Sequence, residues 1–598
     1  MGTPHPGTDA AFFCIFGGKT GENVTATRAL RPFSAKVGGR TQRMRDWRRK
    51  WRHRRMSMDD PHSGSGGGGS GGVKKGDSAG KNNEGHGGGQ GGGGNGNGNA
   101  DGGEPLQPSL AANEERLGHI LQDCSDIAFR RFRIKDGREA LLVYTEGIVD
   151  SAETHLHMLM PLLFFVDPGL AEKGADAAAS QGVSLSQMRR IDSVEQAVEA
   201  VLSANVLLLV DGYAEGAAFN VKGGTRRSVQ EPNSEVVIRG PREGFTENLR
   251  VNTALLRFKI KSPDLKMVRF VKGTYTRTDI VLAYIDGIAD RKIVQEAKRR
   301  IEAIEINSVL ESGYIEELIE DHPNSPFPQL QYTERPDTVA GQLLEGRFAI
   351  LVDGTPFVMI GPITVWQLLQ ASEDYYERFY ISNLIRWLRF GFALIALYLP
   401  ALYVAVVTFH PDMLPTTLLL SVAAAREAIP FPALVEMLIM EVSFEALREA
   451  GIRLPKTVGQ AVSILGALVV GQAAVEAGIV SAPVVIIVSL TGIASFTIPR
   501  FSLAITIRIL RFVMIFAAAA FGLYGLVIAT IMLVAHMCNL NSFGVPYLTG
   551  VAPFRGRDQQ DIFIRTPWSR MNYMPGTYVQ SRRKRTDQNT KQGVHESW

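Results

Sequence analysis

Hydrophobic and polar positions divide the chain into regions with different patterns. Residues 1–109 contain stretches such as SGSGGGGSGG, which cannot bury enough apolar surface to offset the entropy of ordering. We expect them to form a disordered, Gly-rich basic tail. Residues 110–385 show the short apolar runs of a soluble domain, whereas 386–538 contain long uncharged runs. Residues 539–598 read as a basic cytoplasmic tail.

One phrase occurs twice in the soluble region. Residues 141–153 read LLVYTEGIVDSAE and residues 281–293 read VLAYIDGIADRKI, which places Gly147 and Gly287 287 − 147 = 140 positions apart. In both copies an apolar run of strand type ends at the glycine, where a turn needs positive φ.

A second phrase repeats at nearly the same interval. Asp211-Gly212 and Asp353-Gly354 each follow a buried-type apolar run, and they lie 353 − 211 = 142 positions apart. Two phrases that recur in register predict an α/β soluble domain built from two similar subdomains. The expected subdomains are 110–245 and 246–385.

Local patterns predict the elements of these subdomains. We expect helices at 113–127, capped by Asn113, and at about 291–306, capped by Asp290. A further helix, capped by Asp150 or Ser151, would hold His155 and His157. We expect strands at 139–145, 205–219, 280–285 and 347–361.

The soluble region shows no convincing catalytic or metal-binding pattern. Its paired acids are explained by turns and helix caps, and His155 and His157 are separated by two positions, which places them on different faces of a helix. The GGKT at 17–20 lacks the first P-loop glycine, because position 13 is Phe13. Three cysteines without a CxxC give neither a disulfide framework nor a zinc site. We therefore predict a protein that is not an enzyme and binds no cofactor, metal or nucleic acid. The acids considered were Glu146, Asp150, Asp286 and Asp290.

Four uncharged runs in the next region are long enough to cross a membrane. They contain 20, 18, 23 and 24 residues, compared with about 20 needed for a hydrocarbon core of about 30 Å. The sequence therefore predicts a multi-span helical membrane domain. The runs are 390–409, 458–475, 477–499 and 512–535.

The stretch between the first two runs is apolar but carries several acids. On a helix at about 431–449, Glu441, Glu445 and Glu449 share one face, and methionine and leucine populate the other. Two interpretations remain open: an amphipathic helix in the membrane interface, or a helix that lines an aqueous path with its acids turned inward.

Basic residues indicate the orientation of the membrane domain. Arg386 and Arg389 precede the first run, and Arg565 follows the last, so both ends are expected in the cytoplasm. Arg508 and Arg511 complicate this count, since placing them inside as well requires another crossing. The sequence is compatible with four or five spans.

Several long motifs resemble the A subunit of the GerA-type bacterial spore germinant receptors. They include EPNSEVVIRGPREGFTENLR from position 231, HPDMLPTTLL from 410, REAIPFPALVEMLIMEVSFEALREAGIRLP from 426 and NLNSFGVPYLTGVAPF from 539. The resemblance extends over roughly 110–575.

This resemblance implies a place in the spore inner membrane. It further implies a complex with a transporter-like B subunit that holds the nutrient and a lipoprotein C subunit. Copies of the A subunit would form a homo-oligomeric ring, with five as the expected number, that releases monovalent cations when nutrient binds. Membrane lipid would be a further partner.

A ring of copies could line a pore with acids, which would favour cations. The pore candidates are Glu436, Glu441, Glu445 and Glu476. In the family's RGPREGF signature, charges beside the turn at Gly240-Pro241 could contact a neighbouring subunit, or form a solvated loop with local ion pairs. The subunit-contact candidates are Arg239, Arg242 and Glu243.

Two other functions compete with a receptor subunit. One is an accessory germination channel paralogue associated with the dipicolinate-release machinery, which the sequence does not separate well from a receptor. A transporter component is less favoured, because a typical transporter has about ten or more spans with inverted repeats, and the repeat found here lies in the soluble half.

Overall fold

The computed structural model describes residues 104–579 except positions 136, 150, 165–187, 222–230, 233, 236, 456–470, 557, 569–570, 572–573 and 575. The predicted tail at 1–109 lies outside the described residues, apart from its last six positions. Asp150, expected as a helix cap, and most of the run 458–475 also lie outside them.

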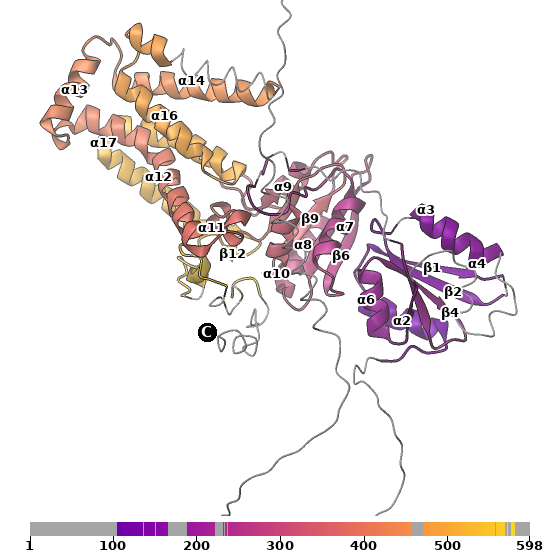
Figure 1. Cartoon of the computed structure of the whole chain (residues 1–598). Coiled ribbons are helices and arrows are strands. Elements are labelled where there is room, and N and C mark those ends of the chain that lie inside the picture. The colour runs from indigo at the N-terminus through magenta and orange to yellow at the C-terminus, as the bar shows by residue number, and fades with distance from the viewer. Residues whose placement is uncertain are drawn as a thin grey trace, which may run out of the picture. The chain divides into compact units, whose positions relative to one another are not determined.

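The first subdomain contains a five-stranded antiparallel sheet with helices on both faces. Its elements are α2 (Leu110–Ile120), β1 (Ile127–Arg133), β2 (Glu139–Thr145), α3 (Ser151–Thr154), the π-helical turn η1 (His155–Leu159), α4 (Met160–Phe164), β3 (Met188–Ile191), α6 (Val194–Leu202), β4 (Asn205–Val210) and β5 (Gly216–Asn220). The strand order is β1-β2-β4-β5-β3. Helices α2 and α6 cover one face of the sheet and α4 covers the other (Figure 1). Because alternate strand residues point to opposite faces, Leu141 and Val143 pack with α2 and α6, whereas Ala140 and Leu142 pack with η1 and α4.

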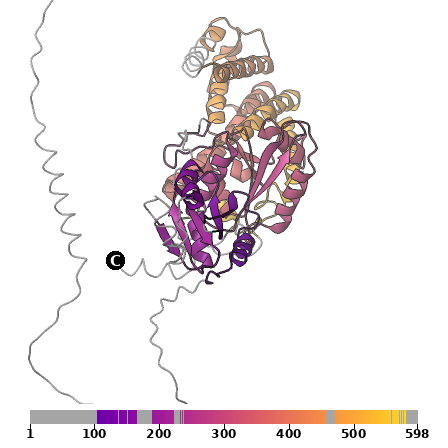
Figure 2. The same ribbon diagram turned by 90° about the vertical axis from the view of Figure 1, so that its right-hand side faces the viewer.

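The second subdomain has the same strand order as the first. Its elements are α7 (Leu249–Lys259), β6 (Leu265–Lys272), β7 (Thr278–Ile285), α8 (Arg291–Glu302), α9 (Ser312–Ile319), β8 (Gln331–Thr333), α10 (Pro336–Leu344), β9 (Phe348–Val352) and β10 (Val358–Gly361). They form an antiparallel sheet in the order β6-β7-β9-β10-β8, visible with its covering helices in Figure 2. The equivalent order agrees with the two similar subdomains expected from the repeated phrases.

The repeated Asp-Gly pairs perform the same structural task in both subdomains. Asp211 Oδ1 accepts a hydrogen bond from the backbone N–H of Leu110 at 3.0 Å, at the start of α2. Asp353 Oδ1 accepts one from the N–H of Leu249 at 3.1 Å, at the start of α7. Each aspartate therefore caps the first helix of its subdomain from a distant hairpin turn, which satisfies an otherwise unpaired helix N–H group.

The repeated glycines lie in turns with positive φ, as predicted. Gly147 has φ 81° and Gly287 has φ 74°. A Cβ on Gly147 would lie 2.6 Å from the carbonyl oxygen of Arg250, so the backbone of α7 also approaches too closely for any side chain.

Several predicted elements need correction. The strand expected at 205–219 is a hairpin of β4 and β5, and that at 347–361 is a hairpin of β9 and β10, because the Asp-Gly pair turns the chain in both. The helix expected at 113–127 covers 110–120. Asn113 lies inside it, where its side chain exchanges two hydrogen bonds with the backbone of Gln107. Strand 139–145 and the Asp290 cap of α8 are confirmed.

A buried ion pair joins the two subdomains. Arg257 of α7 donates from Nε and Nη2 to the two carboxylate oxygens of Asp126, both at 2.9 Å. The side chains are 0% and 3% exposed. Asp126 directly precedes β1, so the pair fixes the start of the first sheet to a helix of the second subdomain. The bidentate geometry also fixes the guanidinium plane of Arg257 relative to the carboxylate plane of Asp126.

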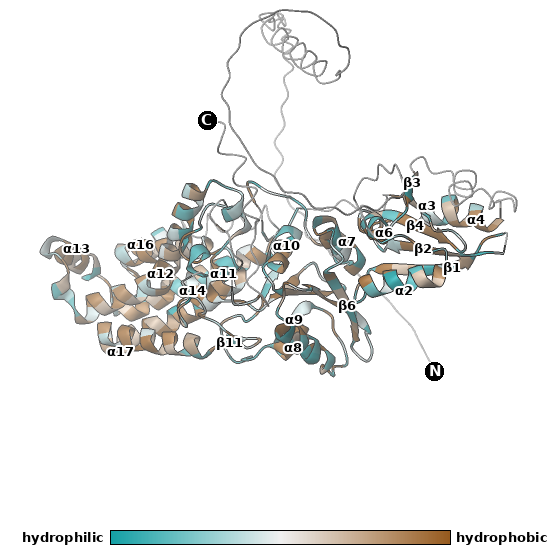
Figure 3. Cartoon of the chain, turned by 90° about the horizontal axis from the view of Figure 1, so that it is seen from below, coloured by the Kyte–Doolittle hydropathy of each residue, from teal (hydrophilic) through white to brown (hydrophobic). Residues whose placement is uncertain are grey.

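The C-terminal region contains apolar helices. They are α12 (Phe379–Phe409), α13 (Thr416–Arg426), α14 (Ala433–Arg453), α16 (Ala482–Phe496) and α17 (Phe501–Asn539). Within the described chain, α12 and α17 are both long and apolar enough to cross a membrane. Figure 3 shows the hydrophobic colouring along them. The predicted spans at 390–409 and 512–535 fall in these two helices, and α16 is shorter than the predicted span at 477–499.

α17 is interrupted by a reversal at Gly522. Gly522 has φ 62° and ψ −143°, a backbone conformation essentially restricted to glycine. On either side of it, Thr506 donates to the carbonyl of Pro326, and His536 hydrogen-bonds Ser325 Oγ at 2.9 Å. A straight helix would separate residues 506 and 536 by about 45 Å. Ser325 and Pro326 are adjacent in the chain, so they cannot contact both ends of a straight helix. The chain therefore reverses at Gly522 and forms a helical hairpin, and the single span expected at 512–535 is wrong.

After this hairpin, the chain returns to the second subdomain. Ser542 Oγ donates to Gln329 O at 2.7 Å and accepts from Ile363 N at 3.2 Å. Tyr547 donates to Pro328 O at 2.8 Å, and Tyr578 packs in the core beneath α8. Part of the region expected as a C-terminal tail thus completes the packing of the soluble fold.

A distance measurement tests the helical hairpin. Spin labels on Phe501→Cys and native Cys538, in a Cys14→Ser, Cys124→Ser background, should lie less than half as far apart as the roughly 56 Å of a straight helix of 538 − 501 = 37 steps. Double electron–electron resonance measures this distance. A separation near that of the straight helix would contradict the reversal, and a label at Phe521→Cys, near the turn, provides the long-distance control.

Candidate functional site

Acids of α14 face arginines of the neighbouring helices. Glu441 and Arg511 of α17 are each 2% exposed, and Arg511 Nη1 lies 2.6 Å from Glu441 Oε2. Arg511 Nε also donates to the carbonyl of Ala396 at 2.9 Å, so this pair links α14, α17 and α12. A buried charge is tolerated when it is paired, and this arrangement pairs the two charges, although Glu441 Oε1 and Arg511 Nη2 have no hydrogen-bond partner among the described residues.

Glu436 forms a second link nearer the start of α14. Its side chain is fully buried, lies 3.1 Å from Arg426 Nε, and accepts a hydrogen bond from the N–H of Ser481 at 2.9 Å. Arg426 ends α13, and Ser481 precedes α16. One carboxylate therefore joins three helical segments.

Glu445 belongs to a larger charged cluster. It pairs with Arg508 of α17 and lies 3.6 Å from Arg448. Arg448 in turn donates to Ser495 Oγ of α16 at 2.7 Å, and its guanidinium lies 4.8 Å from the ring centre of Phe496. Together with the Glu441–Arg511 pair, these residues bring three guanidinium groups and two carboxylates among apolar helices. We refer to all five as the helix charge cluster: Glu441, Glu445, Arg448, Arg508 and Arg511.

The fourth pore candidate lies apart from this cluster. Glu476 is exposed and accepts a hydrogen bond from Gln472 at 2.8 Å. Glu449, which was expected on the same face as Glu441 and Glu445, is exposed and pairs with Arg453 at 2.6 Å. The structure thus brings Glu441 and Glu445 into one cluster, and places Glu436 in a separate pair.

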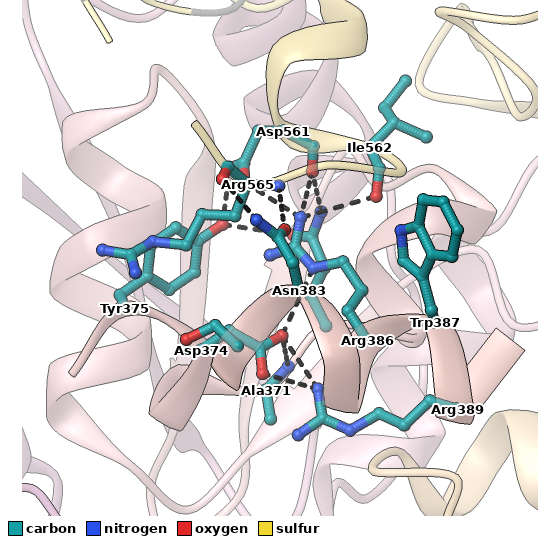
Figure 4. A network of polar contacts seen from close by, with 12 residues as sticks. Ala371, Asp374, Tyr375, Asn383, Arg386, Trp387, Arg389, Asp561, Ile562 and Arg565 are labelled. Carbon is teal, nitrogen blue, oxygen red and sulfur yellow. Dashed lines mark hydrogen bonds and ion pairs between the residues drawn. The ribbon is translucent and has the colours of Figure 1, made fainter. Parts of the chain in front are cut away.

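A second polar network lies where α12 meets the soluble region (Figure 4). Asp374 lies in the 3-10 helix Ser372–Tyr375. Arg389 Nη1 donates to its two carboxylate oxygens, Oδ1 at 2.7 Å and Oδ2 at 2.8 Å. Arg386 lies 3.5 Å from the same carboxylate and 3.1 Å from Asp561 Oδ1. Tyr375 donates to Asp561 Oδ2 at 2.6 Å. We call these residues the junction network, and they join the segment before α12, α12 itself and the C-terminal segment.

The electrostatics of the junction network reflect its burial. Burial raises the pKa of Asp561, and the charge of Arg386 opposes this change. Burial also raises the pKa of Tyr375 well above its usual range, which keeps its hydroxyl protonated as a donor. Arg386 and Arg389 are buried, so they act as internal partners rather than as simple basic flanks of a span.

The sequence analysis did not identify the ion-pair partners in the helix charge cluster or in the junction network. Arg508 and Arg511 appeared as a difficulty for orientation, and Arg565 as a flanking charge, although Arg565 is buried and donates to Glu377 O at 3.0 Å. A usable signal was the spacing of Arg508 and Arg511 inside an apolar run, because charges there require partners.

The predicted subunit-contact residues lie on the surface. Arg239 is 3.9 Å from Glu377, Arg242 is 3.8 Å from Glu231, and Glu243 pairs with Lys259 at 3.0 Å. Both arginine side chains are largely exposed. These exposed intrachain pairs are compatible with both interpretations from the sequence, a subunit-contact surface and a solvated loop.

Among the described residues, no group of three or more His, Cys, Asp or Glu side chains is arranged to hold a metal ion.

An acidic helix lies beside the base of α17. Burial, together with the neighbouring Glu320 and Glu311, raises the pKa of Glu316 on α9 to about 7. The charge of Glu316 also contributes to the raised pKa of Tyr332, whose first cause is burial and which is hydrogen-bonded to Ser502 of α17. This carboxyl group therefore titrates near neutral pH at the contact between the sheet and the helices.

The comparisons with known proteins agree on one family. The family described as "Bacillus/Clostridium GerA spore germination protein" matches residues 115–577. The chain is 59% identical to the "Uncharacterized membrane protein YfkQ" of Bacillus subtilis, covering 79% of this chain and 92% of that protein. It is 47% identical to "Spore germination protein KA" of the same organism, covering 77% and 85%.

Two further similarities complete this picture. The chain is 31% identical to "Stage V sporulation protein AF" of Bacillus subtilis, covering 76% of this chain and 92% of that protein. Among solved structures, the N-terminal domain of the A subunit of the Bacillus megaterium spore germinant receptor GerK3 matches with 35% identity and a TM-score of 0.35, covering 43% of this chain and 96% of that domain.

A double-mutant cycle tests the central ion pair. Arg511→Met should lower the free energy of unfolding by about 3 kcal/mol or more, because Glu441 then remains buried without its partner. Adding Glu441→Met should restore most of this loss. Thermal unfolding in detergent measures both values, and Arg453→Met, at an exposed pair, serves as the control. Additive losses in the double variant would contradict a coupled pair.

The titration of Glu316 predicts a pH dependence. Its pKa in the folded protein is about 7 compared with a usual 4.5, so the folded state binds more protons between these values and its stability falls as pH rises from about 4.5 to about 7. Glu316→Gln should remove this fall and add about 2 kcal/mol at pH 8, less than the full shift implies because solvent screens part of it.

The matched control for this change is Glu317→Gln, which removes the same charge from an exposed neighbour. Unfolding is followed from pH 5 to pH 8. Equal pH profiles for wild type and Glu316→Gln would contradict the raised pKa.

Proposed function

Because the chain belongs to the GerA family of spore germination proteins, we propose that it is the A-type subunit of a spore germinant receptor in the spore inner membrane. The family match covers most of the chain, and the identity to Spore germination protein KA supports this assignment. The proposed partners are the transporter-like B subunit and the lipoprotein C subunit.

In this proposal, several copies, with five as the expected number, surround a path for monovalent cations. The hairpin of α17 supports it: α12 and the two arms of α17 place three apolar helical segments in one copy, and both arms of α17 contact the soluble region. A single copy of this size is small to enclose a pore, whereas a ring can line one with a helix from each copy.

The observation that carries the proposal is the helix charge cluster. Charged side chains among apolar helices are costly and are usually functional. The glutamates are held by arginines in this conformation, so the proposed opening exchanges these partners for water and cations. Glu441 and Glu445 would then face the path, with Glu436 near one end and Glu476 as a candidate already exposed.

The junction network is the proposed link between nutrient sensing and this path. It holds the first turns of α12 to Asp374 and Asp561, which belong to segments on either side of the helical region in the sequence. A movement of the soluble region would therefore act directly on α12. The exposed charges at Arg239, Arg242 and Glu243 are the proposed contacts to a neighbouring copy.

The accessory paralogue is the second candidate function. The similarity to Stage V sporulation protein AF supports it, but at 31% this identity is lower than the 47% to Spore germination protein KA. Co-purification separates the two candidates, since a receptor subunit should bring down a transporter-like partner and a lipoprotein.

Ion flux tests the acid candidates. Glu445→Gln and Glu476→Gln should each reduce nutrient-triggered potassium efflux from liposomes that contain the complete receptor, because each change removes one negative charge per copy. Glu449→Gln, at an exposed pair, should leave efflux within about twofold of wild type, the change expected for a weak surface interaction. Unchanged efflux in the variants of all four candidate acids would remove the acid-lined path from the proposal.

A further inference from the structure

The first turns of α12 have charged side chains inside and apolar side chains outside. The side chains of Arg386 and Arg389 are 0% and 10% exposed, because both face Asp374 in the junction network. Leu384 and Trp387, on the same turns, are 65% and 62% exposed. A helix base surrounded by water would show the opposite arrangement, since charged side chains are rarely buried and large apolar ones usually are.

The 561–568 segment, which follows α17 in the chain, shows the same arrangement. Asp561 belongs to the junction network, and Arg565 is buried. Ile564 and Trp568, by contrast, are 51% and 54% exposed. Two stretches that are far apart in sequence therefore both turn their charges inward and their apolar side chains outward.

Side chains of α12 hold the backbone of this segment in place (Figure 4). Asn383 donates to the carbonyl of Arg565 at 3.0 Å and accepts a hydrogen bond from its N–H at 2.7 Å. Trp387 Nε1 donates to the carbonyl of Phe563 at 2.9 Å. These bonds satisfy backbone groups that lie outside regular helices and strands, as a position beside lipid requires. The exposed side chains of the segment thus extend the apolar surface of α12.

The position of these contacts along α12 matches the edge of a bilayer. The uncharged run 390–409 is as long as a hydrocarbon core of about 30 Å requires. Positions 387 and 383 lie 390 − 387 = 3 and 390 − 383 = 7 residues before this run, or about 4.5 and 10.5 Å along the helix axis. The headgroup region adds about 5 to 7.5 Å on each side of the core. With the run in the hydrocarbon core, the 561–568 segment lies at the level of the headgroups and just outside it, where tryptophan is enriched.

We propose that the first turns of α12 and the 561–568 segment form a membrane-surface site that binds the headgroup layer of a lipid bilayer. The apolar surface continues along α12 through the exposed side chains of Leu388 and Leu394, which favours lipid over a neighbouring copy as its occupant. Part of the region expected as a cytoplasmic tail would then lie in the membrane surface. The inference rests on α12 crossing the membrane, as in the proposed function, but not on nutrient sensing or ion flux.

Spin labels test this site. Ile564→Cys and Leu384→Cys are made in a variant in which serine replaces all three native cysteines, and each full-length protein is reconstituted in vesicles of phosphatidylcholine and phosphatidylglycerol. Both positions are exposed, so the replacements remove no buried side chain. Power-saturation EPR compares collisions of the label with oxygen, which partitions into lipid, and with a water-soluble nickel chelate. The oxygen-to-nickel ratio at both sites should lie between those of two controls, Glu317→Cys on the exposed face of α9 and Leu402→Cys within the apolar run.

Each other result contradicts a defined part of the proposal. A ratio at either Ile564 or Leu384 equal to that at Glu317, with a lipid-like ratio at Leu402, would overturn the membrane-surface site and leave α12 as a span. A water-like ratio at Leu402 would overturn the site together with the span. Rare collisions with both reagents at Ile564 would show that protein covers the surface, and would overturn lipid as its occupant.

Discussion

Buried charge that must find a partner is the constraint on which this structure depends. Arg257 meets Asp126 between the subdomains, Arg386 meets Asp561 at the base of α12, and Arg511 meets Glu441 among the helices. In each pair the partners come from segments more than 65 positions apart, by the arithmetic 257 − 126 = 131, 561 − 386 = 175 and 511 − 441 = 70. Removing one partner leaves an uncompensated charge away from water, so these contacts hold particular segments together more strictly than apolar packing does.

Each of the three pairs connects a different set of structural elements. Arg257 and Asp126 relate one sheet to the other, and the junction network relates the second subdomain to α12. The helix charge cluster relates α12, α14, α16 and α17 to one another. The junction network and the helix charge cluster share α12, so a displacement of the segment before α12 can act on the other apolar helices through hydrogen-bonded groups.

Local patterns predicted the soluble fold well. The strand at 139–145 and the cap at Asp290 depend on neighbours in sequence, and alternation or capping chemistry reveals them. The hairpins were missed because Asp211-Gly212 was taken as part of one strand, although this dipeptide is itself a turn signal.

The helical region was less predictable, for a physical reason. Hydropathy detects how apolar a run is but not where it reverses, and Gly522 lies within an uncharged stretch that passes every length rule. The partners of Glu436, Glu441 and Glu445 were missed because ion pairing between helices depends on tertiary packing. Arg508 and Arg511 inside an apolar run indicate that partners are needed, but the sequence does not say which glutamates of another helix they meet.

The return of the chain to the second subdomain has a consequence for biosynthesis. Ser542 and Tyr547 supply contacts to the 328–329 segment, and Tyr578 enters the core beneath α8, so the sheet receives its last pieces only after every apolar helix has been made. During synthesis the second sheet therefore cannot complete its packing until the segment that follows α17 has left the ribosome.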